Sequence, residues 1–183
     1  MTKNATAAAV PRNNTPIKDE TRLSWEKLAC GRVGIDSRYV RMPATTTTAE
    51  LIDSIGSLSE DPDVHGILLQ HPVGEHIDER AAFEAIAPGK DVDGVTMHSF
   101  AAMSFGLPGF VSCTPGGIMR LLDDYDVDVA GKHPVVVGRS AILGRPAGML
   151  LLGRELMVTK PRRPRRGPSG TSGGRRPASC REW

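Results

Sequence analysis

The chain has 183 residues, 39% of them hydrophobic, so it can bury one ordinary core or parts of two. Its net charge of +2 conceals an imbalance, because residues 159–183 carry +7 and the remaining residues therefore carry −5. No apolar run reaches the roughly 18 residues that a membrane span needs and no hydrophobic signal segment opens the chain, which predicts a cytoplasmic protein.

The first part of the chain alternates helix-like and strand-like segments. Residues 1–18 are polar, with two prolines and no hydrophobic periodicity, and are expected to form an irregular leader. The apolar spacing that follows predicts a helix over residues 20–33 that Gly34 ends, and a threonine-capped helix over residues 49–58. Strands are predicted over residues 38–42 and 64–70.

The later segments continue this alternation. A short helix is predicted over residues 78–86, with Asp78 as its cap, followed by a loop up to Thr114. Thr114 and the proline after it predict a helix that runs to about residue 124. A strand over residues 134–137, a glycine-containing turn and a helix over residues 146–153 complete the pattern. Strands that alternate with helices predict an α/β fold with a mostly parallel sheet.

The last segment has a different composition. Residues 159–183 contain no Leu, Ile, Val, Phe or Met, while Arg, Pro, Gly and Ser dominate. Such a segment cannot bury enough apolar surface to offset its ordering entropy, so a disordered tail is expected. The three cysteines, Cys30, Cys113 and Cys180, are odd in number and lack a Cys-x-x-Cys pair, so neither a disulfide framework nor a metal site is predicted.

The turn after residue 137 is a candidate for chemistry. A strand, a glycine turn and a helix present backbone N–H groups and the positive end of the helix dipole, which favour phosphate. The spacing from Gly138 to Gly144 is not the G-x-G-x-x-G fingerprint, so a dinucleotide site and an ordinary turn both stay open. Arg139 is either a phosphate partner or a solvated surface arginine.

Four phrases occur in a fixed order along the chain. They are Gly66-Ile67-Leu68-Leu69-Gln70-His71-Pro72, Lys90-Asp91-Val92-Asp93-Gly94, Cys113-Thr114-Pro115-Gly116-Gly117-Ile118, and Val135-Val136-Val137-Gly138-Arg139-Ser140 with Gly144 and Pro146. Together they resemble the signature blocks of the bifunctional methylenetetrahydrofolate dehydrogenase/cyclohydrolase family, called FolD, over about residues 21–152.

The resemblance implies a two-domain enzyme. A three-layer α/β catalytic domain would occupy residues 19–124, and the start of a Rossmann-type NADP-binding domain residues 125–158, with a folate cleft between them. The family oxidises 5,10-methylenetetrahydrofolate with NADP and hydrolyses the methenyl product to 10-formyltetrahydrofolate. Its members are commonly homodimers.

The resemblance also implies roles for single residues. Gln70 matches the glutamine that hydrogen-bonds the family's acid/base lysine, and Asp93 matches the aspartate that binds the pterin. The residues that match the NADP-binding turn are Gly138, Arg139, Ser140, Gly144 and Pro146. Without the resemblance, Gln70 is a polar residue at a strand end and Asp93 a turn aspartate before a glycine.

The family's Tyr-x-x-x-Lys pair is not matched in register. An ungapped alignment places Arg22 at the tyrosine position and Glu26 at the lysine position, while Lys27 lies one residue on, about 100° around a helix. Lys27 is therefore either the catalytic lysine in a shifted register or an exposed helix lysine. His71 and Ser99 stand where the family usually has Leu and Asn.

Both ends of the chain depart from the family pattern. Residues 1–19 do not resemble the family's first elements, so the sheet is expected to lack a central strand, and a frameshift or gene-model error near Leu156 would account for the tail. An inactive or weakly ligand-binding remnant is the second candidate function. Nucleic-acid binding through the basic tail ranks last, because the tail lacks interleaved aromatic residues.

Overall fold

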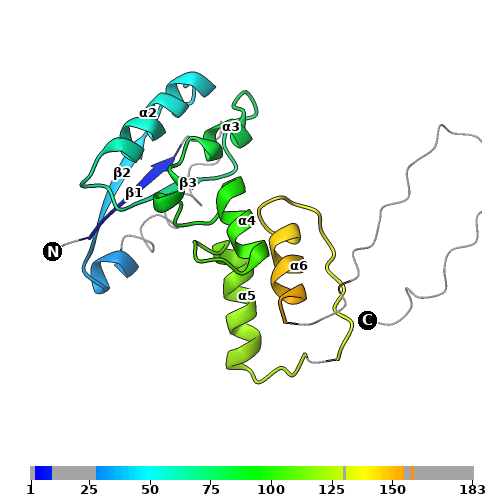
Figure 1. Ribbon diagram of the computed structural model, residues 1–183. Helices are drawn as coiled ribbons and strands as arrows, with labels where there is room; N and C mark the ends of the chain where they lie inside the picture. The colour runs from blue at the N-terminus through cyan, green and yellow to red at the C-terminus, as the bar shows by residue number, and fades with distance from the viewer. Residues whose placement is uncertain (1–2, 10–27, 130, 155–157, 159–183) are drawn as a thin grey trace, which may run out of the picture.

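The computed structural model describes residues 3–9, 28–129, 131–154 and 158. Residues 28–32 are helical. The other elements are β1 (Lys3–Ala9), β2 (Ile35–Arg41), α2 (Thr48–Glu60), β3 (Gly66–Gln70), α3 (Glu79–Glu84), the 3-10 turn η1 (Pro88–Lys90), α4 (Met97–Phe105), α5 (Cys113–Asp124) and α6 (Gly144–Leu152). The predicted mixed α/β class is confirmed (Figure 1). Within the described ranges, no helix has the length and apolar character that a membrane crossing requires.

The sheet is parallel and β1 is its central strand. The strand order is β2-β1-β3, and Thr6 is paired with Arg38 on one side and with Ile67 on the other. The expectations of an irregular leader and of a missing central strand are therefore wrong for Lys3–Ala9. The alanine-rich sequence of β1 has little strand preference of its own, and backbone pairing on both sides decides its conformation. Residues 10–18 lie outside the described part.

One hydrophobic core is formed by the sheet together with α2 and α3. Helix α2 packs against α3 and β3 (Figure 1). The buried side chains of this core are Leu51, Ile55, Leu58, Val64, Ile67, Leu69, Val73, Ile77, Ala82, Phe83, Ile86 and Val95. These positions follow the apolar spacing of the sequence, so the predicted helix over residues 49–58 and the predicted strand over residues 64–70 are confirmed with small shifts of their ends.

The predicted helix caps are also present. Thr47 and Glu50 form a capping box at the start of α2, in which the Glu50 carboxylate accepts from the Thr47 N–H at 2.8 Å. Asp78 Oδ1 accepts from Ala81 N–H at 3.0 Å. Gly34, with φ of +73°, follows the helical residues 28–32, as a helix-ending glycine should.

Three local predictions need correction. The segment between α3 and residue 114 is not only loop, because it contains η1 and α4, and α4 has Thr96 as its cap. Helix α5 begins at Cys113 with Ser112 at the cap position, not Thr114. The strand predicted over residues 134–137 is reduced to a single bridge at Val135. A strand needs neighbours to pair its backbone, and the three-stranded sheet of the described residues does not extend to this segment.

The remaining helices form a second, smaller cluster. Helix α6 packs against α5 and α4, with Met119 and Leu151 buried between them (Figure 1). The Arg154 guanidinium binds both carboxylate oxygens of Asp123, at 2.7 and 2.6 Å. This hydrogen bonding holds the pKa of Asp123 below its ordinary value and raises that of Arg154. The pair fastens the end of α6 to α5.

Candidate functional site

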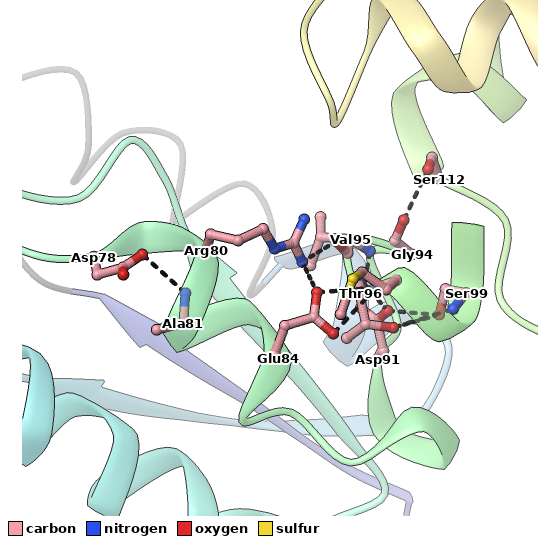
Figure 2. A network of polar contacts seen from close by, with 11 residues as sticks. Asp78, Arg80, Ala81, Glu84, Asp91, Gly94, Val95, Thr96, Ser99 and Ser112 are labelled. Carbon is pink, nitrogen blue, oxygen red and sulfur yellow. Dashed lines mark hydrogen bonds and ion pairs between the residues drawn. The ribbon is translucent and has the colours of Figure 1, made fainter. Parts of the chain in front are cut away.

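A buried carboxylate organises the loop between η1 and α4. Asp91 is fully buried, and its oxygens accept from Val95 N–H at 3.1 Å, Thr96 N–H at 2.9 Å and the Ser99 hydroxyl at 2.6 Å (Figure 2). Three donors satisfy the buried charge, which would otherwise be strongly unfavourable. The Asp91 network therefore fixes the loop that carries Asp93. It also gives Ser99 a structural partner inside the protein.

The same loop is fastened to the start of α5. Gly94 has φ of +65°, and a Cβ there would lie 2.5 Å from the backbone nitrogen of Ser112. The Ser112 hydroxyl donates to the Gly94 carbonyl at 2.8 Å (Figure 2), and Cys113 N–H donates to the Asp93 carbonyl at 3.2 Å. Only a glycine allows this approach. Two of the signature phrases are thereby brought into contact.

A second brace comes from α3. Arg80 donates to the Val95 carbonyl at 2.7 Å and pairs with Glu84 on the same helix (Figure 2). The Glu84 carboxylate accepts from Met97 N–H, the first residue of α4, at 3.0 Å. A negative charge at a helix start is favourable, so this pair orients α4 relative to α3.

A cavity of about 180 Å³ lies beside the Asp93 loop. It is lined by His71, Asp93, Val95, Cys113, Thr114, Ser140, Ile142 and Leu143. These residues come from the end of β3, the Asp93 loop, the start of α5 and the turn before α6. Ile142 also packs against the core of the sheet. All four signature phrases thus contribute to, or adjoin, one cavity.

Two ionisable side chains face each other in this cavity. His71 Nε2 and Asp93 Oδ2 are 3.8 Å apart, and the side chains are 27% and 21% exposed. This separation is an ion-pair distance rather than a hydrogen bond. The His71 ring makes a T-shaped contact with Phe83 of α3, with centroids 5.6 Å apart and planes at 86°. The aromatic contact limits how the imidazole can turn.

Gln70 has one polar atom without a described partner. Its Nε2 donates to the His71 carbonyl at 3.4 Å. Its Oε1 is buried, and among the described residues no donor reaches it. A buried acceptor of this kind normally has a partner. Lys27, together with Arg22 and Glu26, lies outside the described part of the chain.

Cys113 lines the cavity at the start of α5. Partial burial of the thiol raises its pKa above the ordinary value, and the negative charge of Asp93 adds to this effect. The thiol donates to the Val92 carbonyl at 3.1 Å. Cys113 is therefore a protonated thiol at neutral pH, and its position does not resemble that of an activated nucleophile.

The predicted cofactor turn has a tight backbone. Gly138 has φ of +153°, and a Cβ on Gly144 would lie 2.7 Å from the Gly138 carbonyl oxygen. The Ser140 carbonyl accepts from Arg145 N–H at 3.0 Å. Ser140 is the one predicted cofactor residue that lines the cavity; Arg139 is exposed and Pro146 is fully buried.

No group of His, Cys, Asp and Glu residues suited to a metal ion occurs among the residues described. The sequence also missed Asp91 and Gly94 as determinants of the site. The signal that could have identified Asp91 is its spacing: Val95 follows it by four residues and Ser99 by eight. At such a spacing an aspartate carboxylate can accept hydrogen bonds from the backbone that follows it.

Two family models match the chain. The tetrahydrofolate dehydrogenase/cyclohydrolase catalytic domain matches residues 10–93, and the NAD(P)-binding domain of the same family matches residues 112–165. The chain is 75% identical over 139 residues to bifunctional protein FolD 1 of Streptomyces avermitilis, a match that covers 76% of this chain and 48% of that protein. It is 63% identical over 130 residues to bifunctional protein FolD 1 of Salinispora arenicola, covering 71% and 47%.

Solved structures are similar as well. The bifunctional FolD enzyme of Campylobacter jejuni superposes with a TM-score of 0.80 at 34% identity, covering 87% of this chain and 56% of that one. The Trypanosoma brucei enzyme, solved with NADP cofactor and an inhibitor, gives a TM-score of 0.78 at 28% identity, covering 86% and 53%. The chain spans about half the length of the curated relatives it matches.

Proposed function

Because this chain belongs to the tetrahydrofolate dehydrogenase/cyclohydrolase family, we propose that it acts in the oxidation of 5,10-methylenetetrahydrofolate and the hydrolysis of the methenyl product to 10-formyltetrahydrofolate. The observation that carries the proposal is the single cavity lined by Asp93 on one side and Ser140 on the other. A pteridine and a nicotinamide must meet for hydride transfer, and residues matched to each ligand share this cavity.

Asp93 is the proposed pterin-binding residue. A carboxylate accepts hydrogen bonds only, so it suits the amino and ring N–H donors of a pterin. Its loop is fixed from behind by the Asp91 network and by the start of α5. A preorganised acceptor costs little reorganisation when the ligand binds.

Lys27 is the proposed acid/base group, with Gln70 as its partner. Dehydrogenation leaves a cation shared by two folate nitrogens, and the addition of water to it requires proton transfers at defined positions. The buried Oε1 of Gln70 can accept a hydrogen bond and has no donor among the described residues. A lysine ammonium would supply such a donor. If Lys27 is instead an exposed helix lysine, replacing it with methionine will leave turnover unchanged.

The turn before α6 is the proposed NADP site. The residues present fit a dinucleotide, because the glycine contact between positions 138 and 144 keeps side chains away from the backbone there. We assign the binding to Gly138, Arg139, Ser140, Gly144 and Pro146, and the extra phosphate of NADP to the exposed Arg139 guanidinium. Bound NADP would accept the hydride.

The same proposal extends to organisation. Residues 19–124 would form a three-layer catalytic domain and residues 125–158 the start of a Rossmann-type domain. The assembly would be a cytoplasmic homodimer. Analytical ultracentrifugation of the purified chain tests the dimer. The sedimentation coefficient of a monomer would contradict it.

Two experiments test the proposal. The increase in NADPH absorbance with methylenetetrahydrofolate and NADP measures turnover, and calorimetry measures the binding of 5-formyltetrahydrofolate. Asp93→Asn should weaken folate binding by about tenfold or more, because a hydrogen bond to a charged group is worth roughly 1.5–3 kcal/mol. Asp53→Asn, an exposed aspartate on α2, is the matched control. Binding without turnover would identify a ligand-binding remnant. The absence of both binding and turnover would reject the proposal.

A further inference from the structure

His71 is the residue of the cavity that the proposed function leaves unused. It follows β3 directly, and its ring nitrogen lies 3.8 Å from Asp93, the proposed pterin acceptor. Both side chains line the same cavity and both are partly exposed to it.

The imidazole has an aromatic neighbour. The Phe83 ring lies perpendicular to it in a T-shaped contact, at a centroid distance of 5.6 Å. The ring therefore has a fixed neighbour on α3 and a carboxylate in front of it. Nε2 is the ring nitrogen that lies 3.8 Å from Asp93 Oδ2.

The described residues around His71 include ionisable groups from three segments of the chain. Asp93 faces it from the loop after η1, and Cys113 lies in the same cavity at the start of α5. On α3, the Arg80 guanidinium lies over the Phe83 ring, 5.3 Å from its centroid, and is paired with Glu84. Among these described groups, Asp93 is the charge that directly faces the imidazole.

We propose that His71 is a positioning residue for Asp93: its imidazolium, beside Oδ2, orients the carboxylate toward the N–H donors of the pterin ring. A carboxylate has about four lone-pair sites, so both partners fit. The inference rests on the proposed function, since it assigns a role within the same folate site. It makes folate binding pH-dependent, because an imidazole pairs with a carboxylate as a cation only when it is protonated.

The experiment measures the Kd of 5-formyltetrahydrofolate at pH 6 and pH 8 for the full chain. We expect His71→Leu to raise the Kd by about two- to fivefold at pH 6, the size typical of a partly exposed ion pair, and to have a smaller effect at pH 8. His71→Gln keeps an N–H donor without the charge, so it should bind with little pH dependence. His98→Leu, an exposed histidine of α4, is the control and should behave as the parent chain.

A second arm separates positioning from direct ligand contact. In an Asp93→Asn background, His71→Leu should leave the Kd unchanged, because the charge that it positions is gone. An equal loss in both backgrounds would mean that His71 touches the ligand itself, and would overturn the inference. Circular dichroism melting curves show that each variant is folded.

The remaining outcomes are also distinct. If the parent chain binds the folate and His71→Leu and His71→Gln bind equally well at both pH values, the positioning role is refuted and the proposed function stands. If the folded parent chain does not bind the folate at all, the proposed function fails and this inference fails with it.

Discussion

Replacing Asp91 by asparagine is the sharpest test of how the site is built. The carboxylate receives three hydrogen bonds, from Val95 N–H on one oxygen and from Thr96 N–H and the Ser99 hydroxyl on the other. Asparagine has almost the same shape but only one acceptor oxygen. Its NH₂ group must therefore face at least one of these donors.

The size of the effect follows from that count. If the asparagine oxygen keeps the Thr96 and Ser99 donors, the Val95 N–H loses its acceptor; the opposite orientation loses two donors. A hydrogen bond to a charged group is worth roughly 1.5–3 kcal/mol, so the substitution should cost about 2–5 kcal/mol of unfolding free energy. Small proteins have only about 5–15 kcal/mol in total.

Urea denaturation followed by circular dichroism measures this loss. Ser99→Ala removes a single donor and should give a smaller loss, roughly 1–2 kcal/mol, while Asp53→Asn on the surface of α2 should change stability by less than about 0.5 kcal/mol. An Asp91→Asn midpoint equal to that of the parent chain would refute the reasoning. It would mean that the three contacts contribute no net stability.

Three further predictions address neighbouring features. Gly94→Ala should destabilise the fold by about 2 kcal/mol or more, because Gly94 has a positive φ and lies against Ser112 at the start of α5. Gly89 has no atom near its Cβ position, so Gly89→Ala should not destabilise the fold. Thermal melting measures both. The raised pKa of Cys113 shifts its alkylation to higher pH, and Asp93→Asn should lower that pKa and speed alkylation at pH 8 severalfold, measured by peptide mass spectrometry; an unchanged rate argues against the charge effect. Thr47→Ala should cost about 1 kcal/mol by removing the cap of α2, and a loss below about 0.3 kcal/mol would show that the capping box is unimportant.

Elements with strong local signals were predictable. Helix α2 combines a threonine cap with apolar residues on one face, and β3 is a compact apolar run. Helix α4 was missed because its apolar residues do not concentrate on one side, although Thr96 and Gly106 mark its two ends. β1 has no local signal at all, since its conformation depends on strands 26 or more residues away in sequence.

Part of the cavity lining could be predicted from the sequence, but the hydrogen bonds that hold the Asp93 loop could not. The four phrases predict roles for Asp93 and Ser140, and both residues line the same cavity. The sequence does not predict that Asp91 is a buried hydrogen-bond acceptor, because charged residues in loops are usually exposed. The roles assigned to Asp93, Lys27, Gln70 and the cofactor turn stay predictions.

The order β2-β1-β3 has a practical consequence for handling this protein. The two outer strands are hydrogen-bonded to β1 and not to each other, so the integrity of the sheet depends on Lys3–Ala9. Loss of Lys3–Ala9 would leave β2 and β3 without the strand that each of them pairs with.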